Sequence, residues 1–316
     1  MSADTSTLDA TERTRALLTT AEPRRRRTDR IMAALIWFAF LLAMVPLVSL
    51  LWTVLFNGAG RVTIDFLSYS MRGIFGGDPG GGIYHAVMGT LIITGCATLI
   101  SVPIGILVAI YLVEYGRGPL ARAVTFFVDV MTGIPSIVAG LFAVSLFTIF
   151  FGAGARFGII GAVALSVLMI PVVVRSCEEM LKLVPNELRE ASYALGVPKW
   201  LTIIRVVLRT AVAGLTTSVL LAIARVIGET APLLVAVGVT DSINFDPSEG
   251  RMMTLPVFIY RQYSQGLATC REGQANCVAD IAIQNAWGAA LTLIVIVMLL
   301  NVAGRLVNRW FAPKTR

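Results

Sequence analysis

Apolar residues are gathered into long runs along this chain, and shorter polar segments separate the runs. A run of about 20 apolar residues is long enough for a helix to cross a lipid bilayer. The pattern therefore predicts an all-α membrane protein with six transmembrane helices. We place these helices at residues 31–56, 83–112, 120–151, 157–174, 210–239 and 281–307.

The first polar segment, residues 1–30, is rich in Thr and Arg and ends in the run Arg24–Arg27. This composition predicts a disordered basic tail. Lys and Arg collect on the cytoplasmic side of membrane proteins. Because most of the 26 Lys and Arg residues lie in four segments that six spans place on one side, both termini are expected to be cytoplasmic. These segments are residues 1–30, 114–122, 175–209 and 305–316.

Two of the predicted spans contain residues that do not suit an uninterrupted membrane helix. The third carries Asp129, followed by Thr132, Pro135 and Ser136, and this pattern predicts a kinked helix. The fifth contains Arg225 and Glu229 and, three residues later, a proline. An ionisable side chain inside the bilayer is costly, so it is by default a functional candidate.

A polar segment at residues 185–209 separates two strongly apolar blocks. Pro185 suits the start of a helix, and Gly196 suits the position just after its end. Between them, three residues fall on one helix face, namely Leu188, Ala191 and Leu195. The segment is interpreted either as a docking surface for a soluble partner or as an ordinary connector, and the pattern by itself leaves both open.

Composition agrees with a membrane protein. Hydrophobic residues make up 56% of the chain and charged residues 14%, and the mean hydropathy is +0.79. A soluble domain has about 25% charged residues, so a globular enzyme is excluded. The net charge of +7 does not indicate a nucleic-acid partner, because the basic residues flank the apolar runs.

Two arginines could form a positive path for a small oxyanion. Arg175 lies at the inner end of the fourth span and Arg225 near the middle of the fifth. A guanidinium binds phosphate-like oxygens through paired hydrogen bonds. Glu229, four residues after Arg225, is expected on the same helix face, where the two form either a transport site or a structural ion pair. Asp129 either accepts a hydrogen bond from a protonated oxyanion or ties two helices together.

The chain lacks the residue sets of hydrolytic enzymes. There is no phosphate-binding G-x-x-x-x-G-K-[ST] motif and no Ser-His-Asp set, and His85 is the single histidine. We therefore expect no catalytic residues, no cofactor and no metal site, and the energy for active transport must come from another chain or an ion gradient. The glycine-rich run at residues 76–82 is interpreted as a flexible linker.

Cys270 and Cys277 share one polar loop, which the six-span topology places on the extracytoplasmic side. Disulfides persist in that oxidising environment, so a local disulfide is expected there. The alternative is two free thiols in a flexible loop.

The polar segment carries a motif that can be compared with a known family. Glu190-Ala191-Ser192, then Gly196, Val206 and Leu208, resembles the EAA loop of ABC importer permeases. In that family the loop forms a coupling helix, which binds in a cleft of an ATPase subunit. Ser192 replaces the second Ala of the motif, Val206 replaces Ile, and Arg209 stands where the family has Pro.

Longer stretches narrow the resemblance to the PstA family, the permease subunits of phosphate ABC importers. They read DVMTGIPSIVAGLF (129–142), IPVVVRSCEEML (170–181), REASYALGVPKW (189–200), ARVIGETAPLL (224–234) and MMTLPVFIYRQY (252–263). The GETAPLL stretch followed by the TLPVFIY loop favours PstA over its sister subunit PstC. The resemblance covers a permease core at residues 83–311 and leaves out the basic tail.

The resemblance implies a type I ABC importer in a bacterial inner membrane, with phosphate as the substrate. Its other parts would be a PstC-like permease subunit, two PstB-like ATPase subunits and an extracytoplasmic PstS-like phosphate-binding protein. By resemblance, Arg175, Arg225 and Glu229 would line the translocation path. Two alternatives remain from the residues: a permease for molybdate or sulfate, and a secondary transporter or channel that works without ATP.

Overall fold

The computed structural model describes residues 23–270 and 276–311, and all regular structure in these ranges is helical. The chain divides into two units, Met1–Leu55 and Phe56–Arg316. The first unit contains most of α2 (Pro23–Gly58), whose apolar side chains are exposed around the helix. A helix that is apolar all round suits a lipid environment. α2 begins before the predicted span, so residues 23–30 are helical rather than disordered, and the rest of the predicted tail lies outside the described residues.

The second unit contains the other helices, which follow one another along the chain. They are α3 (Ile64–Ser68), α4 (Tyr84–Ile110), α5 (Pro119–Thr132), α6 (Ser136–Phe151), α7 (Gly158–Lys182), α8 (Asn186–Ala194), α9 (Lys199–Thr202), α10 (Leu208–Val226), α11 (Ala231–Ala236), α12 (Leu255–Gln265) and α13 (Ile281–Phe311). A π-helical turn, Tyr111–Tyr115, extends α4, and a second one, Ile203–Val207, joins α9 to α10.

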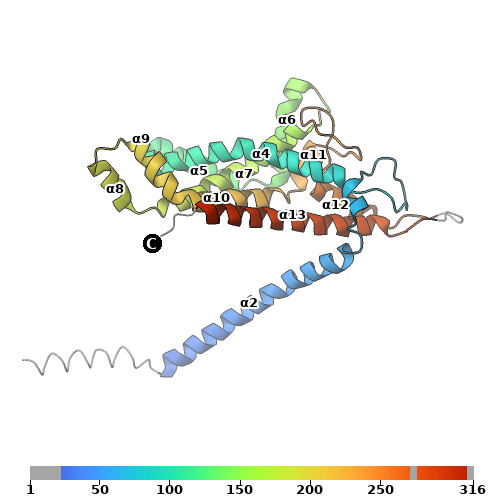
Figure 1. Cartoon of the computed structure of the whole chain (residues 1–316), viewed down its shortest axis with the longest axis horizontal. Helices are drawn as coiled ribbons and strands as arrows, with labels where there is room; N and C mark the ends of the chain where they lie inside the picture. Colours follow the sequence, from blue (N-terminus) through green and yellow to red (C-terminus); the bar gives the residue numbers. More distant parts are fainter. Residues whose placement is uncertain (1–22, 271–275, 312–316) are drawn as a thin grey trace, which may run out of the picture. The chain divides into compact units, whose positions relative to one another are not determined.

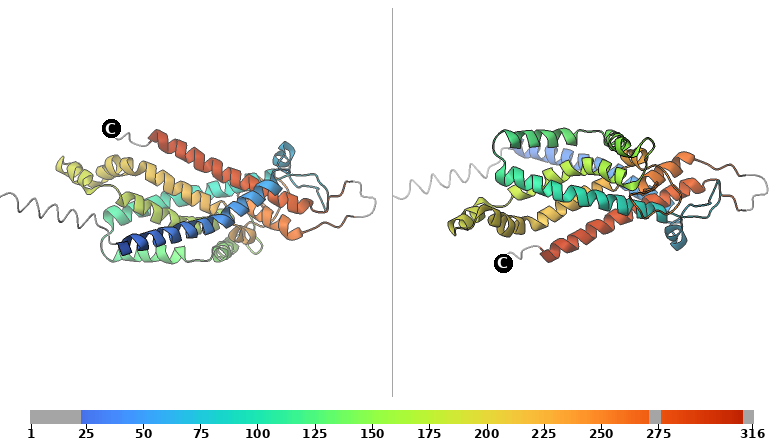
Figure 2. Two further views of the ribbon diagram at one scale, coloured as in Figure 1. Left: turned by 90° about the horizontal axis from the view of Figure 1, so that it is seen from below. Right: turned by 90° about the horizontal axis from the view of Figure 1, so that it is seen from above.

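Helices corresponding to all six predicted spans are present, but the third and the fifth are broken. Five helices of the described chain are long and apolar enough to cross a membrane: Arg27–Gly58, Tyr84–Tyr115, Gly158–Lys182, Lys199–Val226 and Ile281–Leu306. α5 and α6 pass the same test together but are bent by 107°. In the second unit, α8 and α9 lie at one end of the long helices and α12 lies at the other (Figures 1 and 2).

The third span is broken more sharply than the predicted kink. Gly133, Ile134 and Pro135 separate α5 from α6. Pro135 has no N–H to donate, and it disfavours a helical backbone at the residue before it. These two effects end α5 and allow α6 to start in a new direction.

The fifth span is also broken, which corrects the prediction of one helix over residues 210–239. α10 ends at Val226, and the short helix α11 begins at Ala231. In a continuous helix the ring of Pro232 would clash with the carbonyl of Gly228, four residues earlier. Arg225 and Glu229 therefore do not share a helix face, because the chain between them leaves the helix.

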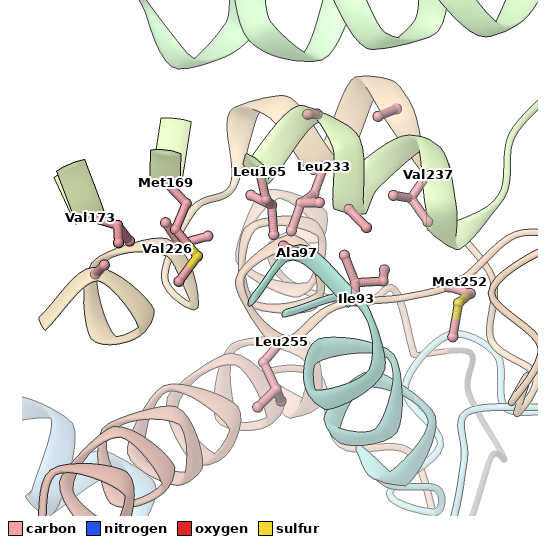
Figure 3. Close-up of a cluster of buried hydrophobic side chains, with 14 of the residues drawn as sticks. Ile93, Ala97, Leu165, Met169, Val173, Val226, Leu233, Val237, Met252 and Leu255 are labelled. Atoms are coloured by element: carbon pink, nitrogen blue, oxygen red, sulfur yellow. The ribbon is translucent and has the colours of Figure 1, made fainter. Parts of the chain in front are cut away.

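α7 forms the centre of the second unit and packs against α4, α5, α6, α10 and α11. Figure 3 shows part of this core, where Leu165 and Met169 of α7 lie near Val226 of α10 and Leu233 of α11. Because lipid is as apolar as these side chains, close van der Waals packing replaces the hydrophobic effect as the stabilising force. Small residues make that packing possible, as at Gly161, where a Cβ atom would lie 2.3 Å from a methyl carbon of Val237.

One glycine contact joins the two broken spans. A Cβ atom on Gly140 of α6 would lie 2.7 Å from the Cα of Pro232 in α11. We expect Gly140→Ala to lower the free energy of unfolding by about 1–3 kcal/mol, because the backbone of α11 must move away. Chemical unfolding in detergent measures this. Gly95 of α4 is the matched control, since a Cβ there meets nothing within 4 Å. Equal stability of the Gly140 and Gly95 alanine variants would contradict the close contact.

Candidate functional site

The two breaks in the spans meet at one cavity. Its volume is about 210 Å³. It is lined by residues from the end of α5, the break before α6 and the first residue of α6, and by residues from the middle of α7, the end of α10 and the break after α10. The lining residues are Met131, Thr132, Ile134, Ser136, Leu168, Val172, Arg225 and Glu229. We call this cavity the central cavity.

Arg225 and Glu229 provide the charges of the central cavity. Arg225 is the one cation and Glu229 the one anion among its lining residues. Neither side chain makes a hydrogen bond or an ion pair with another residue in the described parts of the chain. The structural ion pair considered from the sequence is therefore not formed, and the guanidinium of Arg225 is available to a ligand.

The start of α6 adds hydrogen-bond donors to the same cavity. Ser136 is the first residue of this 16-residue helix and lines the cavity. The first N–H groups of a helix have no partner within the helix, and the helix dipole favours an anion at this position. A broken membrane helix that ends beside a guanidinium is an arrangement suited to an anionic substrate.

Arg175 lies outside the central cavity and belongs to a network of charged side chains. Its guanidinium forms ion pairs with Asp129 of α5 and, at 2.8 Å, with Glu178 one turn further along α7. Glu178 also accepts a hydrogen bond from Lys182 at 2.7 Å. Asp129 is thus tied to α7, as one of the two interpretations from the sequence held. Glu178 was missed, although its spacing of three residues from Arg175 is a signal for such a pair.

This network lies between the central cavity and the α8 end of the unit. Asp129 is one turn before Thr132 in α5, and Arg175 is one turn after Val172 in α7. The two arginines of the predicted path therefore do not lie in one cavity. Arg225 is in the cavity with a free guanidinium, and Arg175 is one turn away with its charge already paired.

The polar segment folds as the sequence predicted. α8 begins at Asn186, directly after Pro185, and the chain turns at Gly196, whose φ of +75° is favourable only for glycine. Glu190 and Ala191 are exposed. Two leucines on the predicted face are exposed as well, Leu188 at 41% and Leu195 at 84%. Such apolar side chains beside an exposed carboxylate form a surface suited to a partner protein.

Ser192, the residue that replaces the second Ala of the EAA motif, is buried. Its hydroxyl lies 2.8 Å from the hydroxyl of Thr202, which is also buried. The two side chains hydrogen-bond α8 to α9. The replacement therefore affects the inner side of the segment and leaves the exposed face of α8 unchanged.

The loop at the opposite end of the unit contains a disulfide between Cys270 and Cys277. A Cβ on Gly77 would lie 2.2 Å from the sulfur of Cys277, and the Gly77 carbonyl accepts a hydrogen bond from Val278 at 2.7 Å. The glycine-rich run is therefore packed against the disulfide loop, which corrects its interpretation as a flexible linker. Glycine is required at position 77 because a side chain would occupy the place of the sulfur.

Arg61 provides a second set of contacts to the glycine-rich run. It donates hydrogen bonds to Asn285 at 2.7 Å and to the carbonyl of Pro79 at 2.9 Å, and its guanidinium lies over the ring of Phe66. Burial lowers the pKa of Arg61, but an arginine keeps its charge at any working pH. These contacts anchor the glycine-rich run to α13.

We expect mass spectrometry of the native chain, alkylated without a reductant, to find Cys270 and Cys277 protected. An oxidising compartment maintains a disulfide of this kind. Reduction before alkylation should add two labelled thiols in the peptide that contains them. Two labelled thiols in this loop without reduction would contradict the disulfide.

Comparisons with known proteins identify the class to which this arrangement belongs. The family model described as "Binding-protein-dependent transport system inner membrane component" matches residues 101–316. A solved structure of an alginate ABC transporter, in complex with its pentasaccharide-bound periplasmic protein, matches 90% of this chain and 97% of its own with a TM-score of 0.60 at 15% identity. An inward-facing structure of the MetNI methionine ABC transporter matches 73% of this chain and 95% of its own, with a TM-score of 0.52 at 20% identity. The fold is that of an ABC importer permease.

Relatives of known name extend over nearly the whole chain. Phosphate transport system permease protein PstA 1 of Mycobacterium tuberculosis is 45% identical over 295 residues, which are 93% of this chain and 92% of the relative. PstA of Mycobacterium leprae is 47% identical over 89% of this chain and 88% of the relative. PstA of Pasteurella multocida is 35% identical over 89% and 95%.

Fold and site together define a multi-pass inner-membrane permease of the binding-protein-dependent class, which is a transport subunit. Within that class, the chain belongs to the PstA family of phosphate transport system permeases. Membership implies, in general terms, an assembly with an ATPase, a further permease subunit and a binding protein.

Proposed function

We propose that this chain is a permease subunit of an ATP-driven phosphate importer and forms half of its translocation path. The observation that carries the proposal is the 45% identity to a phosphate transport permease over 93% of the chain. The central cavity supports it independently, because an unpaired arginine and the first turn of α6 meet there. Both groups favour an oxyanion.

Phosphate in the central cavity would accept hydrogen bonds from Arg225 and from the Ser136 hydroxyl. Glu229 in the same cavity is well placed to accept a hydrogen bond from a protonated phosphate oxygen. Sulfate has no such proton near neutral pH, so this carboxylate would discriminate against it. The negative charge also limits how tightly the anion binds, and a substrate in a translocation path must be released as well as bound. Glu229 takes the role that the sequence interpretation gave to Asp129.

The assembly would contain a PstC-like permease, two PstB-like ATPase subunits and a PstS-like phosphate-binding protein. The exposed face of α8 would bind the ATPase through Leu188, Ala191, Leu195 and Glu190, with Gly196 setting the turn that follows. With the ATPase bound at α8, the α8 end of the unit would lie in the cytoplasm, and the expected six-span topology would put both termini there as well. The disulfide loop and α12 would then face the binding protein.

The other functions considered from the sequence are not favoured. The relatives are named for phosphate rather than molybdate or sulfate. The fold matches permeases of ATP-binding transporters, which does not favour a secondary transporter.

Uptake of radiolabelled phosphate by proteoliposomes tests the proposal. The chain would be co-expressed and purified with its ATPase, its sister permease and its binding protein. We expect uptake that requires internal ATP and is not reduced by an excess of sulfate or molybdate. Uptake without ATP, or a complex that transports sulfate or molybdate in place of phosphate, would contradict it.

A further inference from the structure

The guanidinium of Arg189 holds three separate elements together at the α8 end of the unit. Its Nε and Nη2 atoms each lie 3.0 Å from the carboxylate of Glu114, in the π-helical turn after α4. Its Nη1 and Nη2 atoms donate to the carbonyls of Val184 at 2.6 Å and Leu181 at 3.1 Å, at the end of α7. Arg189 itself belongs to α8. One side chain thus connects α8 with the end of α4 and the end of α7.

This contact is buried, in contrast to the exposed face of α8. The Arg189 and Glu114 side chains are only 12% and 5% exposed. A cation at the C-terminal end of α7 also interacts favourably with the helix dipole and caps carbonyls that would otherwise lack partners. A planar guanidinium with acceptors on several sides has little freedom to reorient. The connection is therefore stiff.

The same π-helical turn also holds the far side of the polar segment. Lys199, the first residue of α9, donates a hydrogen bond to the carbonyl of Glu114, and its ammonium lies 4.6 Å from the centre of the Tyr115 ring. Glu114 therefore binds α8 through its carboxylate and α9 through its carbonyl.

We propose that the ion pair between Arg189 and Glu114 is the strut through which movement of α8 reaches the central cavity. This inference rests on the proposed coupling of α8 to an ATPase. When α8 moves, the strut displaces the end of α4 and the end of α7 together. α4 packs along α7, and α7 contributes Leu168 and Val172 to the cavity wall. Arg189 and Glu114 are positioning residues, which do not touch the substrate.

The test measures uptake and ATP hydrolysis separately in the reconstituted complex. In Glu114→Gln and in Arg189→Gln, the phosphate taken up per ATP hydrolysed should fall about tenfold, the scale on which residues that couple two sites act. Arg117→Gln is the matched control, because Arg117 is exposed and lies three residues from Glu114. It should leave the ratio unchanged. An unchanged ratio in both strut variants would overturn the proposal.

A covalent link separates a mechanical role from a purely structural one. Glu114→Cys and Arg189→Cys would be combined with Cys96→Ala and Cys177→Ala, so that a short bismaleimide joins only the new pair. After assembly, crosslinking should restore the uptake per ATP, and a maleimide with one reactive group should not. No recovery after complete crosslinking would overturn the strut.

If the glutamine variants fail to assemble, the double variant Glu114→Gln with Arg189→Met leaves no buried charge without a partner. Assembly of this variant with a lowered ratio supports the strut. If this variant assembles with a normal ratio of phosphate taken up to ATP hydrolysed, or if it fails to assemble, the strut proposal is overturned. The ion pair would then have a role in folding alone. The unmodified complex is measured first: if it takes up no phosphate, the proposed function fails, whereas normal uptake with unchanged coupling in the variants contradicts only the strut.

Discussion

Arg225→Gln is expected to lower phosphate uptake by about a hundredfold or more, while the complex still assembles. Arg225 is the one cation that lines the central cavity, and no described residue pairs with its side chain. A hydrogen bond to a charged group contributes about 1.5–3 kcal/mol, and a factor of one hundred corresponds to about 2.7 kcal/mol. Because the Arg225 side chain makes no hydrogen bond or ion pair within the described part of the chain, folding should not change.

The measurement is ATP-dependent uptake of radiolabelled phosphate, together with recovery of the ATPase on the purified variant. Arg225→Lys should be intermediate, because a lysine keeps the charge but loses the paired hydrogen bonds. Arg209→Gln is the matched control, since Arg209 is an exposed arginine at the other end of α10. If Arg225→Gln prevented assembly, Arg225 would have a structural role; if it transported normally, the central cavity would not be the path.

Glu190→Arg should abolish uptake to a similar extent, for a different reason. Glu190 is exposed on α8, and no described residue pairs with it. Reversing its charge should leave the fold of the permease intact. At an interface with an ATPase, however, it replaces a carboxylate with a cation and leaves the partner's groups unsatisfied. Like-charge contacts at an interface cost several kcal/mol.

The expected signature is a permease that is still made and inserted but has lost the ATPase, or holds it without transport-linked hydrolysis. Co-purification and binding-protein-stimulated ATP hydrolysis measure these two outcomes. Glu179→Arg makes the same charge change on an exposed residue near the end of α7 and should transport normally. Normal uptake by the Glu190 variant, with the ATPase bound, would contradict the docking role of α8.

The two sites differ in how far the sequence predicts them. The helix over residues 186–194 was predictable, because Pro185 and Gly196 determine its ends through local backbone preferences. The shared face of Leu188 and Leu195 was predictable as well, but only the structure shows that both side chains are exposed. The cavity was predictable only in part. Arg225 and Glu229 were recognised as costly in a membrane, but they were assigned to one helix face.

The charge partners were the least predictable feature. Asp129 is 46 residues from Arg175, and Arg189 is 75 residues from Glu114. Many acid–base pairings satisfy the same composition, and spacing along a helix detects only those three or four residues apart. The pairing within α7, between Arg175 and Glu178, has this local signal. The pairings between helices have none.

The sequence alone determined where apolar helices form, where the polar segment folds and which family the chain resembles, because each follows from neighbouring residues or a local motif. The tertiary structure alone decided that the third span bends by 107°, that the fifth span ends at Val226, and that these breaks meet against α7. A proline or glycine weakens a helix locally, but the angle that results depends on what packs around it. Here, Gly140 of α6 against Pro232 of α11 sets that packing, and it joins residues 92 positions apart in the chain.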